Sequence, residues 1–507
     1  MLPEKDATPT YLEIGRRKRE ERQSRIPSEW QIKGTIESGL DVRDVPAKCG
    51  ILTIRELEMT SDNDAVDLVA KIRSRKYSAV EVTVAFCKRA AIAQQLTNCL
   101  TEMFFEEAIQ RARELDEEQA NSPDGPLRPL HGLPISLKDA FKIPGRDSTT
   151  GIVCWAFQPD EEYSFLPAML LDLGAVLYCK TNTPQTMMTA DSDNNLFGRT
   201  LNPANSNLTA GGSSGGEGAL IAMRGSVLGI GSDIAGSIRI PSLCNGIYGL
   251  RPSADIVPYG GQRHVTPPGM CGIAAVAGPM ATTLRSCSYF MKTIIEAQPW
   301  RYDPCSLHLS WIGHEATREL RIGIAFEDGA FTPWPPVRRT MQGTAKQLTR
   351  AGVEVIPIHL PDVHEALGTA FRMFALDGCK FIQDRLLESG EPEIESVRRV
   401  NLAGIPGATL DELFEMNAVR ERIQAIYHRL WLDNRLDALI LPSAATTATP
   451  IDEWGPVTYT ALWNFLDYPA VILPTGRVQP GDEADSLENA RHGDMDRKNY
   501  SLCESSI

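Results

Sequence analysis

Two turns rich in glycine and serine contain the residues best suited to nucleophilic chemistry. The first, GGSSGG, places Ser213 and Ser214 between glycines, and the second, GSDIAGSIRIP, places Ser237 after a strand-like stretch. Glycines at this density let the backbone approach a small ligand closely. Backbone N–H groups that converge in such a turn can stabilise a developing oxyanion while a serine attacks a carbonyl carbon. The second turn therefore indicates acyl chemistry, with Ser237 as the candidate nucleophile.

A serine nucleophile needs a base, and the histidines do not offer a convincing one. His264 lies beside Arg263 in a turn and His428 lies on a helical face, so both are predicted to be surface or core residues. Lys138 interrupts the apolar, strand-like run LPISLKDAF. Burial disfavours an ammonium group and lowers its pKa toward neutrality, which makes a lysine a possible base. An ion pair with Asp139 at the end of the strand explains this lysine equally well.

The sequence offers no nucleotide or metal motif. GxxxxGK[ST] is absent, and so is GxGxxG in a strand-turn-helix setting, so ATP and dinucleotides are not expected. GGSSGG matches GxSxG with either serine, but any such hexapeptide does so. The 11 cysteines show no CxxC pairing and there is no HExxH. We expect neither a metal nor a cofactor.

The amino-acid composition and net charge disfavour several classes of binding partner. The chain has 507 residues, with 51 Lys plus Arg against 65 Asp plus Glu and a formal net charge of -14. This charge disfavours nucleic acid and anionic membrane surfaces as partners. No stretch approaches the roughly 18 to 20 apolar residues of a membrane span, and the N-terminus lacks the apolar core of a secretory signal. We expect a cytoplasmic protein without a nucleic-acid or membrane partner.

Strand and helix patterns alternate around these motifs. Strands are predicted near residues 133–140, 176–179, 227–230, 321–326, 353–358, 437–442 and 469–474. Helices are predicted near residues 65–72, 105–118 and 337–350. A further helix begins at Ser78, where Glu81 three residues later completes a capping box. The alternation predicts an α/β fold with a largely parallel sheet covered on both faces. We expect a helical N-terminal arm over residues 1–60, one catalytic domain over 61–475, and a polar loop or disordered tail over 476–507.

Taken together, HGLPISLKDAF, GGSSGGEGAL and GSDIAGSIRIPSLCNGIYGLRPS closely resemble the amidase signature family. The resemblance extends over roughly residues 10–475 and is strongest to the fungal acetamidase and general amidase branch. It implies an α/β/α sandwich with a central twisted mixed β-sheet flanked by helices. It also implies hydrolysis of a carboxylic amide to an acid and ammonia or an amine, without a cofactor.

The same motifs imply roles for individual residues. Ser237 corresponds to the acyl-ester nucleophile, Ser213 to a bridging serine after a cis peptide bond with Gly212, and Lys138 to the terminal base. Four backbone amides match the family's oxyanion hole: Ile234, Ala235, Gly236 and Ser237.

Further residues match positions around this centre. Met187 matches a position that lines the substrate site, although core packing explains it equally well. Asp233 and Arg239 are predicted to pair and hold the turn, and Ser214 is predicted to support it by hydrogen bonding.

The sequence departs from the family pattern in two places. Ala235-Gly236 stands where two glycines are usual, and a positive φ at Ala235 would add strain of order 1 kcal/mol or more. The family's GAPVGLQLVGRR-like stretch after the VILP-type strand is not present, so the sheet is expected to lack a strand.

We therefore predict an amidase that acts on a small, uncharged monocarboxylic amide, with a homodimer as the family-like state. One alternative is a biosynthetic hydrolase or acyl-transfer enzyme of specialised metabolism. Another is a truncated, non-catalytic relative that acts as a binding protein.

Overall fold

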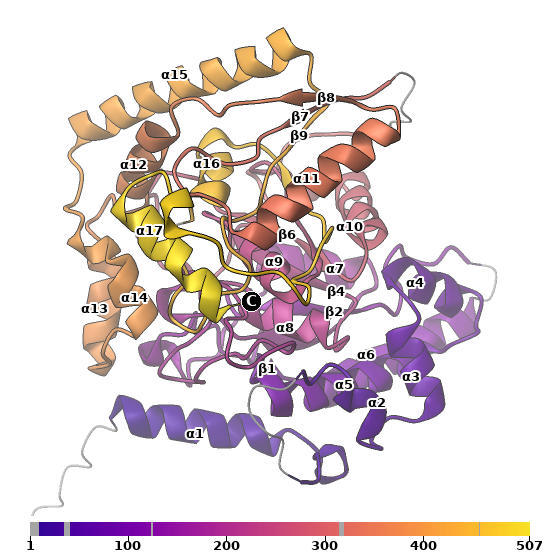
Figure 1. The fold of residues 1–507 in the computed structure, drawn as a ribbon. Coiled ribbons are helices and arrows are strands. Elements are labelled where there is room, and N and C mark those ends of the chain that lie inside the picture. The colour runs from indigo at the N-terminus through magenta and orange to yellow at the C-terminus, as the bar shows by residue number, and fades with distance from the viewer. Residues whose placement is uncertain (1–9, 35–40, 123–124, 314–318, 456, 507) are drawn as a thin grey trace, which may run out of the picture.

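The computed structural model describes residues 10–34, 41–122, 125–313, 319–455 and 457–506. Within them, seven strands form one sheet (Figure 1): β1 (Leu100–Met103), β2 (Pro134–Lys138), β3 (Val176–Thr181), β4 (Leu228–Asp233), β5 (Tyr248–Arg251), β6 (Val276–Ala281) and β10 (Ala470–Ile472). Their order is β1-β3-β2-β4-β6-β5-β10. Strand β2 is parallel to β3 and β4, and the other neighbours are antiparallel. The α/β fold with a mixed central sheet is confirmed, whereas the prediction of a largely parallel sheet is wrong.

Three further strands of the described residues form a separate parallel sheet, in the order β8-β7-β9. They are β7 (Arg321–Ile324), β8 (Glu354–Pro357) and β9 (Ala438–Ile440). Each lies where the sequence predicts a strand. The sequence did not predict that they leave the central sheet, because alternation within a strand carries no information about its pairing partner.

Helices surround both sheets. In the described chain they are α1 (Tyr11–Ser24), α2 (Val45–Lys48), α3 (Ile54–Ser61), α4 (Ala65–Arg73), α5 (Ala79–Thr97), α6 (Phe105–Asn121), α7 (Phe165–Asp172), α8 (Gly215–Ala222), α9 (Arg239–Asn245), α10 (Leu284–Glu296), α11 (Pro335–Arg350), α12 (Val363–Phe374), α13 (Lys380–Ser389), α14 (Glu395–Val400), α15 (Leu410–Asn434), α16 (Thr458–Leu466) and α17 (Asp494–Ser501). The capping box of Ser78 and Glu81 opens α5 as predicted. None of these helices is long and apolar enough to cross a lipid bilayer.

Strand β4 presents different side chains to its two faces. Leu228 and Ile230 enter the largest hydrophobic core, whereas the alternate positions, Gly229 and Gly231, carry no side chain. A Cβ at Gly229 would lie 2.0 Å from Glu217 Oε2 on α8. Glycine here lets α8 lie close against the sheet. This brings the turn before α8, with its serines, to the end of β2.

The N-terminal helix α1 contacts β1, the edge strand of the central sheet. Lys18 is 3% exposed, and its Nζ lies 2.6 Å from Glu102 and 2.8 Å from Asp147. Arg22 donates to the Leu100 carbonyl at 2.7 Å. The predicted boundary at residue 60 falls inside α3, so the division into arm and catalytic domain stays a prediction.

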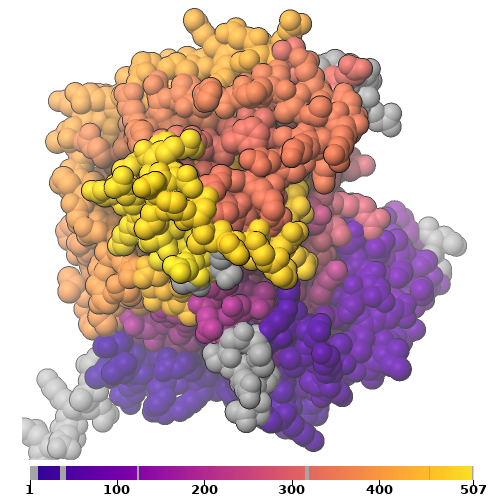
Figure 2. Space-filling model, in the orientation of Figure 1, coloured from indigo at the N-terminus to yellow at the C-terminus, as the bar shows by residue number. Residues whose placement is uncertain are grey.

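The C-terminal segment, residues 476–506, folds onto the body. Figure 2 shows it in yellow on the surface formed by earlier, orange-coloured parts of the chain. It contains helix α17, and Tyr500 at its end is 1% exposed. The prediction of a loop or disordered tail is therefore wrong for residues 494–505, which form helices, whereas residues 476–486 run as a loop. The polar composition of this segment did not indicate that it packs on the body, because only a few apolar side chains make the contact. Tyr500, Cys503 and Ala490 pack around Trp334.

Candidate active site

Lys138 ends strand β2 in a fully buried position. Its Nζ donates to Ser213 Oγ at 2.6 Å and to Ser232 Oγ at 2.9 Å. Burial lowers the pKa of Lys138 to about 7, although the carboxyls of Asp233, Glu217 and Asp139 oppose this shift. A lysine in this state can hold or release a proton near neutral pH.

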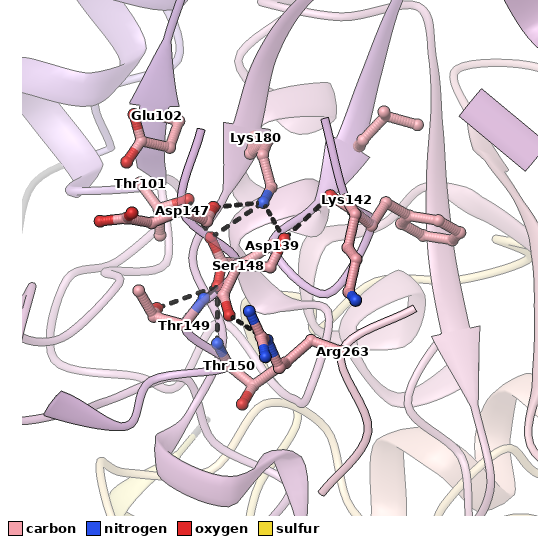
Figure 3. A network of polar contacts seen from close by, with 12 residues as sticks. Thr101, Glu102, Asp139, Lys142, Asp147, Ser148, Thr149, Thr150, Lys180 and Arg263 are labelled. Carbon is pink, nitrogen blue, oxygen red and sulfur yellow. Dashed lines mark hydrogen bonds and ion pairs between the residues drawn. The ribbon is translucent and has the colours of Figure 1, made fainter. Parts of the chain in front are cut away.

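The alternative interpretation, an ion pair of Lys138 with Asp139, is not what the described residues form. Asp139 instead lies 3.8 Å from Lys180 (Figure 3). One carboxylate oxygen accepts bonds from the Thr149 amide at 2.8 Å and the Thr150 amide at 2.7 Å. These bonds fix the loop that follows Lys138, so Asp139 holds the backbone next to the lysine.

The turn before α8 brings Ser213 to Lys138. The Gly212–Ser213 peptide bond is cis, as the resemblance implies. A Cβ at Gly212 would lie 2.0 Å from the Asp191 carbonyl oxygen, so only glycine fits there. The position of Ser213 therefore depends on a close packing of two backbone segments.

Ser214 joins the two glycine turns. Its amide donates to the Ser237 carbonyl at 3.1 Å, and its hydroxyl donates to the Ser232 carbonyl at 3.3 Å. The predicted support by hydrogen bonding is present. It places the turns of Ser213 and Ser237 side by side.

Ser237 lies two residues before the start of α9 and is 8% exposed. It lines a pocket together with Gly212, Ile234 and Ala235. Within the described chain its hydroxyl has no hydrogen-bond partner, so the structure brings Ser213 and Lys138 into contact but does not join Ser237 to them by a hydrogen bond. The hydroxyl faces the pocket that a substrate would enter.

The four predicted oxyanion amides are not equivalent. The Gly236 amide donates to Asp233 Oδ1 at 2.8 Å and is therefore occupied in this structure, so its role in the oxyanion hole stays a prediction. Among the described residues, the amides of Ile234, Ala235 and Ser237 have no hydrogen-bond partner. Three donors thus stay free beside the Ser237 hydroxyl.

The expected strain at Ala235 is absent. Ala235 is not among the residues with positive φ, whereas Gly236 has φ +132°. A Cβ at Gly236 would lie 2.3 Å from Thr460 Oγ1. The turn thus requires glycine at position 236 and accepts alanine at 235.

The predicted pair of Asp233 and Arg239 is present and buried. Arg239 Nη2 lies 2.9 Å from Asp233 Oδ1, and Asn464 Nδ2 donates to the same oxygen at 2.9 Å. Burial alone would raise the pKa of Asp233, but the Arg239 guanidinium outweighs it and holds that pKa well below its usual range. The carboxylate stays charged and fixes the turn through the Gly236 amide.

Sequence reasoning missed several residues of the site. Ser232 contacts Lys138, and its place directly before Asp233 was the only available signal. Glu217 is fully buried and accepts bonds from Ser136 Oγ at 2.7 Å and Thr181 Oγ1 at 3.0 Å. Burial raises the pKa of Glu217 to about 8. No local pattern marks this acidic residue as a neighbour of Lys138.

The pocket beside Ser237 measures about 760 Å³. Met187 lines it and has φ +57°, so of the two interpretations the structure places this residue at the pocket. His264 and His428 are not among its lining residues, whereas His364 and His492 are. Neither of the latter two was singled out from the sequence.

Comparison with known proteins places this geometry in a family. The family model described as Amidase matches residues 81–490. The chain belongs to the amidase family. The amidase is 39% identical over 483 residues to an Amidase of Gibberella moniliformis, covering 92% of this chain and 90% of that one. It is 36% identical to an Acetamidase of Aspergillus oryzae, covering 97% of this chain and 92% of that one.

A solved structure agrees with the sequence relatives. The amidase superposes on a Fatty acid amide hydrolase with a TM-score of 0.87 and 32% identity, covering 91% of this chain and 82% of that chain. The family and these relatives make the protein a hydrolase that acts on amides.

Proposed function

We propose that this amidase cleaves carboxylic amides through an acyl-enzyme on Ser237, with Ser213 as the proton relay and Lys138 as the base. The observation that carries the proposal is the contact of 2.6 Å between a fully buried Lys138 Nζ and Ser213 Oγ. A lysine desolvated in this way is a base at neutral pH, and no histidine lies in its place.

The relay accounts for every proton. Ser237 Oγ attacks the carbonyl carbon while its proton passes to Ser213 Oγ, whose own proton passes to neutral Lys138. The C–N bond then breaks, and the leaving nitrogen receives a proton from Ser213, which Lys138 reprotonates. Water then attacks the acyl ester while its proton passes through Ser213 to Lys138, and the relay returns a proton to Ser237 Oγ as the C–Oγ bond breaks and the acid is released.

The free backbone amides of Ile234, Ala235 and Ser237 can donate hydrogen bonds to the oxyanion that forms on the substrate carbonyl. Preorganised N–H donors of this kind stabilise the tetrahedral intermediate without reorganisation during the reaction. The Asp233–Arg239 pair keeps the turn that carries them in place.

A fluorophosphonate probe tests the proposal without knowledge of the substrate. We expect the probe to modify Ser237, as mapped by mass spectrometry, and Ser237→Ala to abolish both labelling and amide turnover. Ser74→Ala serves as the control, because this exposed serine does not line the pocket and takes no part in the relay. Labelling of another serine, or turnover by Ser237→Ala, would contradict the assignment of the nucleophile.

A further inference from the structure

The pocket beside Ser237 is much larger than the small amide that the sequence predicts as substrate. Its volume of about 760 Å³ falls within the roughly 300–1,000 Å³ typical of sites for drug-sized ligands. Two helices that are distant in sequence, α12 and α17, form part of its wall. Their facing residues are therefore candidates for a substrate-binding surface.

Helix α12 turns one face to the pocket. The lining residues recur at helical spacing: His364, Leu367, Gly368, Phe371 and Phe374. Apart from the histidine and the glycine they are large and apolar. This face is suited to an apolar ligand group rather than to a polar one.

Gly368 leaves open space on this face. It lies inside α12 without a positive φ, and a Cβ built there meets no atom within 4 Å. Glycine in a helix interior is disfavoured relative to alanine, and here neither backbone conformation nor packing requires it. The space that the missing side chain leaves belongs to the pocket.

Helix α17 contributes the opposing surface from the C-terminal segment. Met495 and Lys498 line the pocket at positions i and i+3 of α17, which lie on one helix face, and Leu502 lines it directly after the helix ends. Met495 is 67% exposed. An apolar side chain this exposed on a pocket wall gains burial when an apolar group binds.

The segment is held firmly enough to act as a wall. Buried Asp496 accepts bonds from the Thr332 amide at 2.8 Å and the Thr332 hydroxyl at 2.7 Å. Trp334 Nε1 donates to the Asn499 carbonyl at 3.2 Å, and Arg338 donates to the Tyr500 hydroxyl at 2.6 Å. These contacts fix the buried face of α17 and so orient Met495 toward the pocket.

Most charged residues of the lining are neutralised within the protein. Arg399 pairs with Glu453 at 2.6 Å, and Asp452 pairs with Arg199 at 2.9 Å. Such paired groups do not require a charged ligand. The apolar face of α12 and the methionine of α17 therefore dominate what the pocket can recognise.

We propose that the space between α12 and α17 receives a large apolar group of the amide substrate, and that Gly368 and Met495 determine how large this group can be. The inference rests on the proposed function, because it takes Ser237 as the reacting group. It replaces the small amide expected from the sequence with an amide that carries a long alkyl or aryl group.

Two substrate series test the inference and distinguish the two sides of the amide bond. One is a set of acyl p-nitroanilides from acetyl to decanoyl, and the other is a set of N-alkylacetamides from methyl to decyl. We expect kcat/KM to rise at least about tenfold with chain length in one series, since each buried methylene adds binding energy. The series that responds identifies the side of the amide that binds between the helices.

Substitutions at Gly368 connect the preference to the pocket. In the series that responds, Gly368→Leu is expected to lower kcat/KM for the longest substrate by at least about tenfold and to change kcat/KM for the shortest substrate little, because the new side chain fills the distal space. Met495→Ala should lower kcat/KM for long substrates and leave kcat/KM for short substrates nearly unchanged. Gly343→Leu is the matched control, because Gly343 lies inside α11, also meets no atom within 4 Å, and does not line the pocket.

The outcomes separate this inference from the proposed function. If Ser237 is labelled but the shortest substrate is preferred in both series, or if Gly368→Leu and Gly343→Leu behave alike on long substrates, the inference is wrong and the proposed function stands. If the folded protein is neither labelled nor active on any member, the proposed function fails. An unchanged melting temperature of Gly368→Leu shows that a lost activity is not a loss of folding.

Discussion

Lys138 shows how one residue acquires its chemistry from its surroundings. The same side chain at the surface would stay protonated at neutral pH, whereas full burial lowers its pKa to about 7. Its two hydroxyl partners accept hydrogen bonds but supply no negative charge. The lysine can therefore be neutral in the working enzyme.

This pKa predicts the pH dependence of the amidase. Only the neutral lysine accepts a proton, so kcat/KM should rise with pH through about 7. Lys138→Ala is expected to lower the rate by about 10²–10⁴-fold and to remove this limb of the profile, as measured by steady-state kinetics between pH 5 and 9. A variant that keeps the full rate and the same limb would exclude Lys138 as the base.

The same shift predicts a change in stability with pH. The pKa of Lys138 is lower in the folded than in the unfolded chain, so the unfolded chain binds more protons above pH 7. This group's contribution to stability should therefore rise with pH from about 7 toward the ordinary lysine value. Denaturant titrations of the protein and of Lys138→Met should converge at high pH, and a difference that does not depend on pH would contradict the shift.

Position 236, not position 235, carries the glycine that the turn needs. Gly236→Ala would bring a Cβ within 2.3 Å of Thr460 Oγ1 in a left-handed conformation, so it should lower turnover by about tenfold or more through a displaced Ser237. Ala235→Gly is the matched control and should not raise the rate. A faster Ala235→Gly enzyme would contradict this assignment and support the backbone strain at Ala235 that we expected from the sequence.

At the scale of elements, α1 is held to the body by a buried charge cluster. Lys18 lies between the carboxylates of Glu102 and Asp147, and all three are almost fully buried. Asp147 also accepts a bond from Lys180 through its backbone carbonyl at 2.5 Å, which connects the cluster with the network around Asp139 (Figure 3). The N-terminal helix thus helps to hold the loop that follows Lys138.

Removing the ammonium group of Lys18 from this cluster should destabilise the folded protein. Lys18→Met removes the ion-pair partner of buried Asp147 and leaves Glu102 with Arg25 alone at 3.2 Å, and we expect a loss of about 3–5 kcal/mol in the free energy of unfolding, measured with denaturant. Arg16→Met on the same helix breaks an exposed pair with Glu20 and should cost less than about 1 kcal/mol. Equal losses in the two variants would mean that the cluster does not anchor α1.

At the scale of the molecule, the first and last α-helices of the described residues, α1 and α17, both dock on the body, and the C-terminal segment completes the pocket. Trp334 is fully buried beneath it. Deletion of residues 476–507 should therefore lower the melting temperature and shift tryptophan emission to longer wavelength as Trp334 meets water. An unchanged spectrum and melting temperature would mean that the segment does not dock in solution.

The sequence by itself determined the local features of this protein. Ser237, Ser213 and Lys138 lie in short motifs whose residue types could be interpreted without any distant contact. The capping box at Ser78 and most strands followed from periodicity in the same way, because hydrogen bonding and alternation within one element depend on neighbours along the chain.

Only the tertiary structure decided which of these groups are available and how much space surrounds them. The Gly236 amide is occupied by Asp233, Glu217 lies near Lys138, and α17 faces α12 across the pocket. Strands of similar pattern also separate into two sheets. Burial, pKa and cavity volume are set by atoms from segments far apart in sequence, so no local pattern contains them.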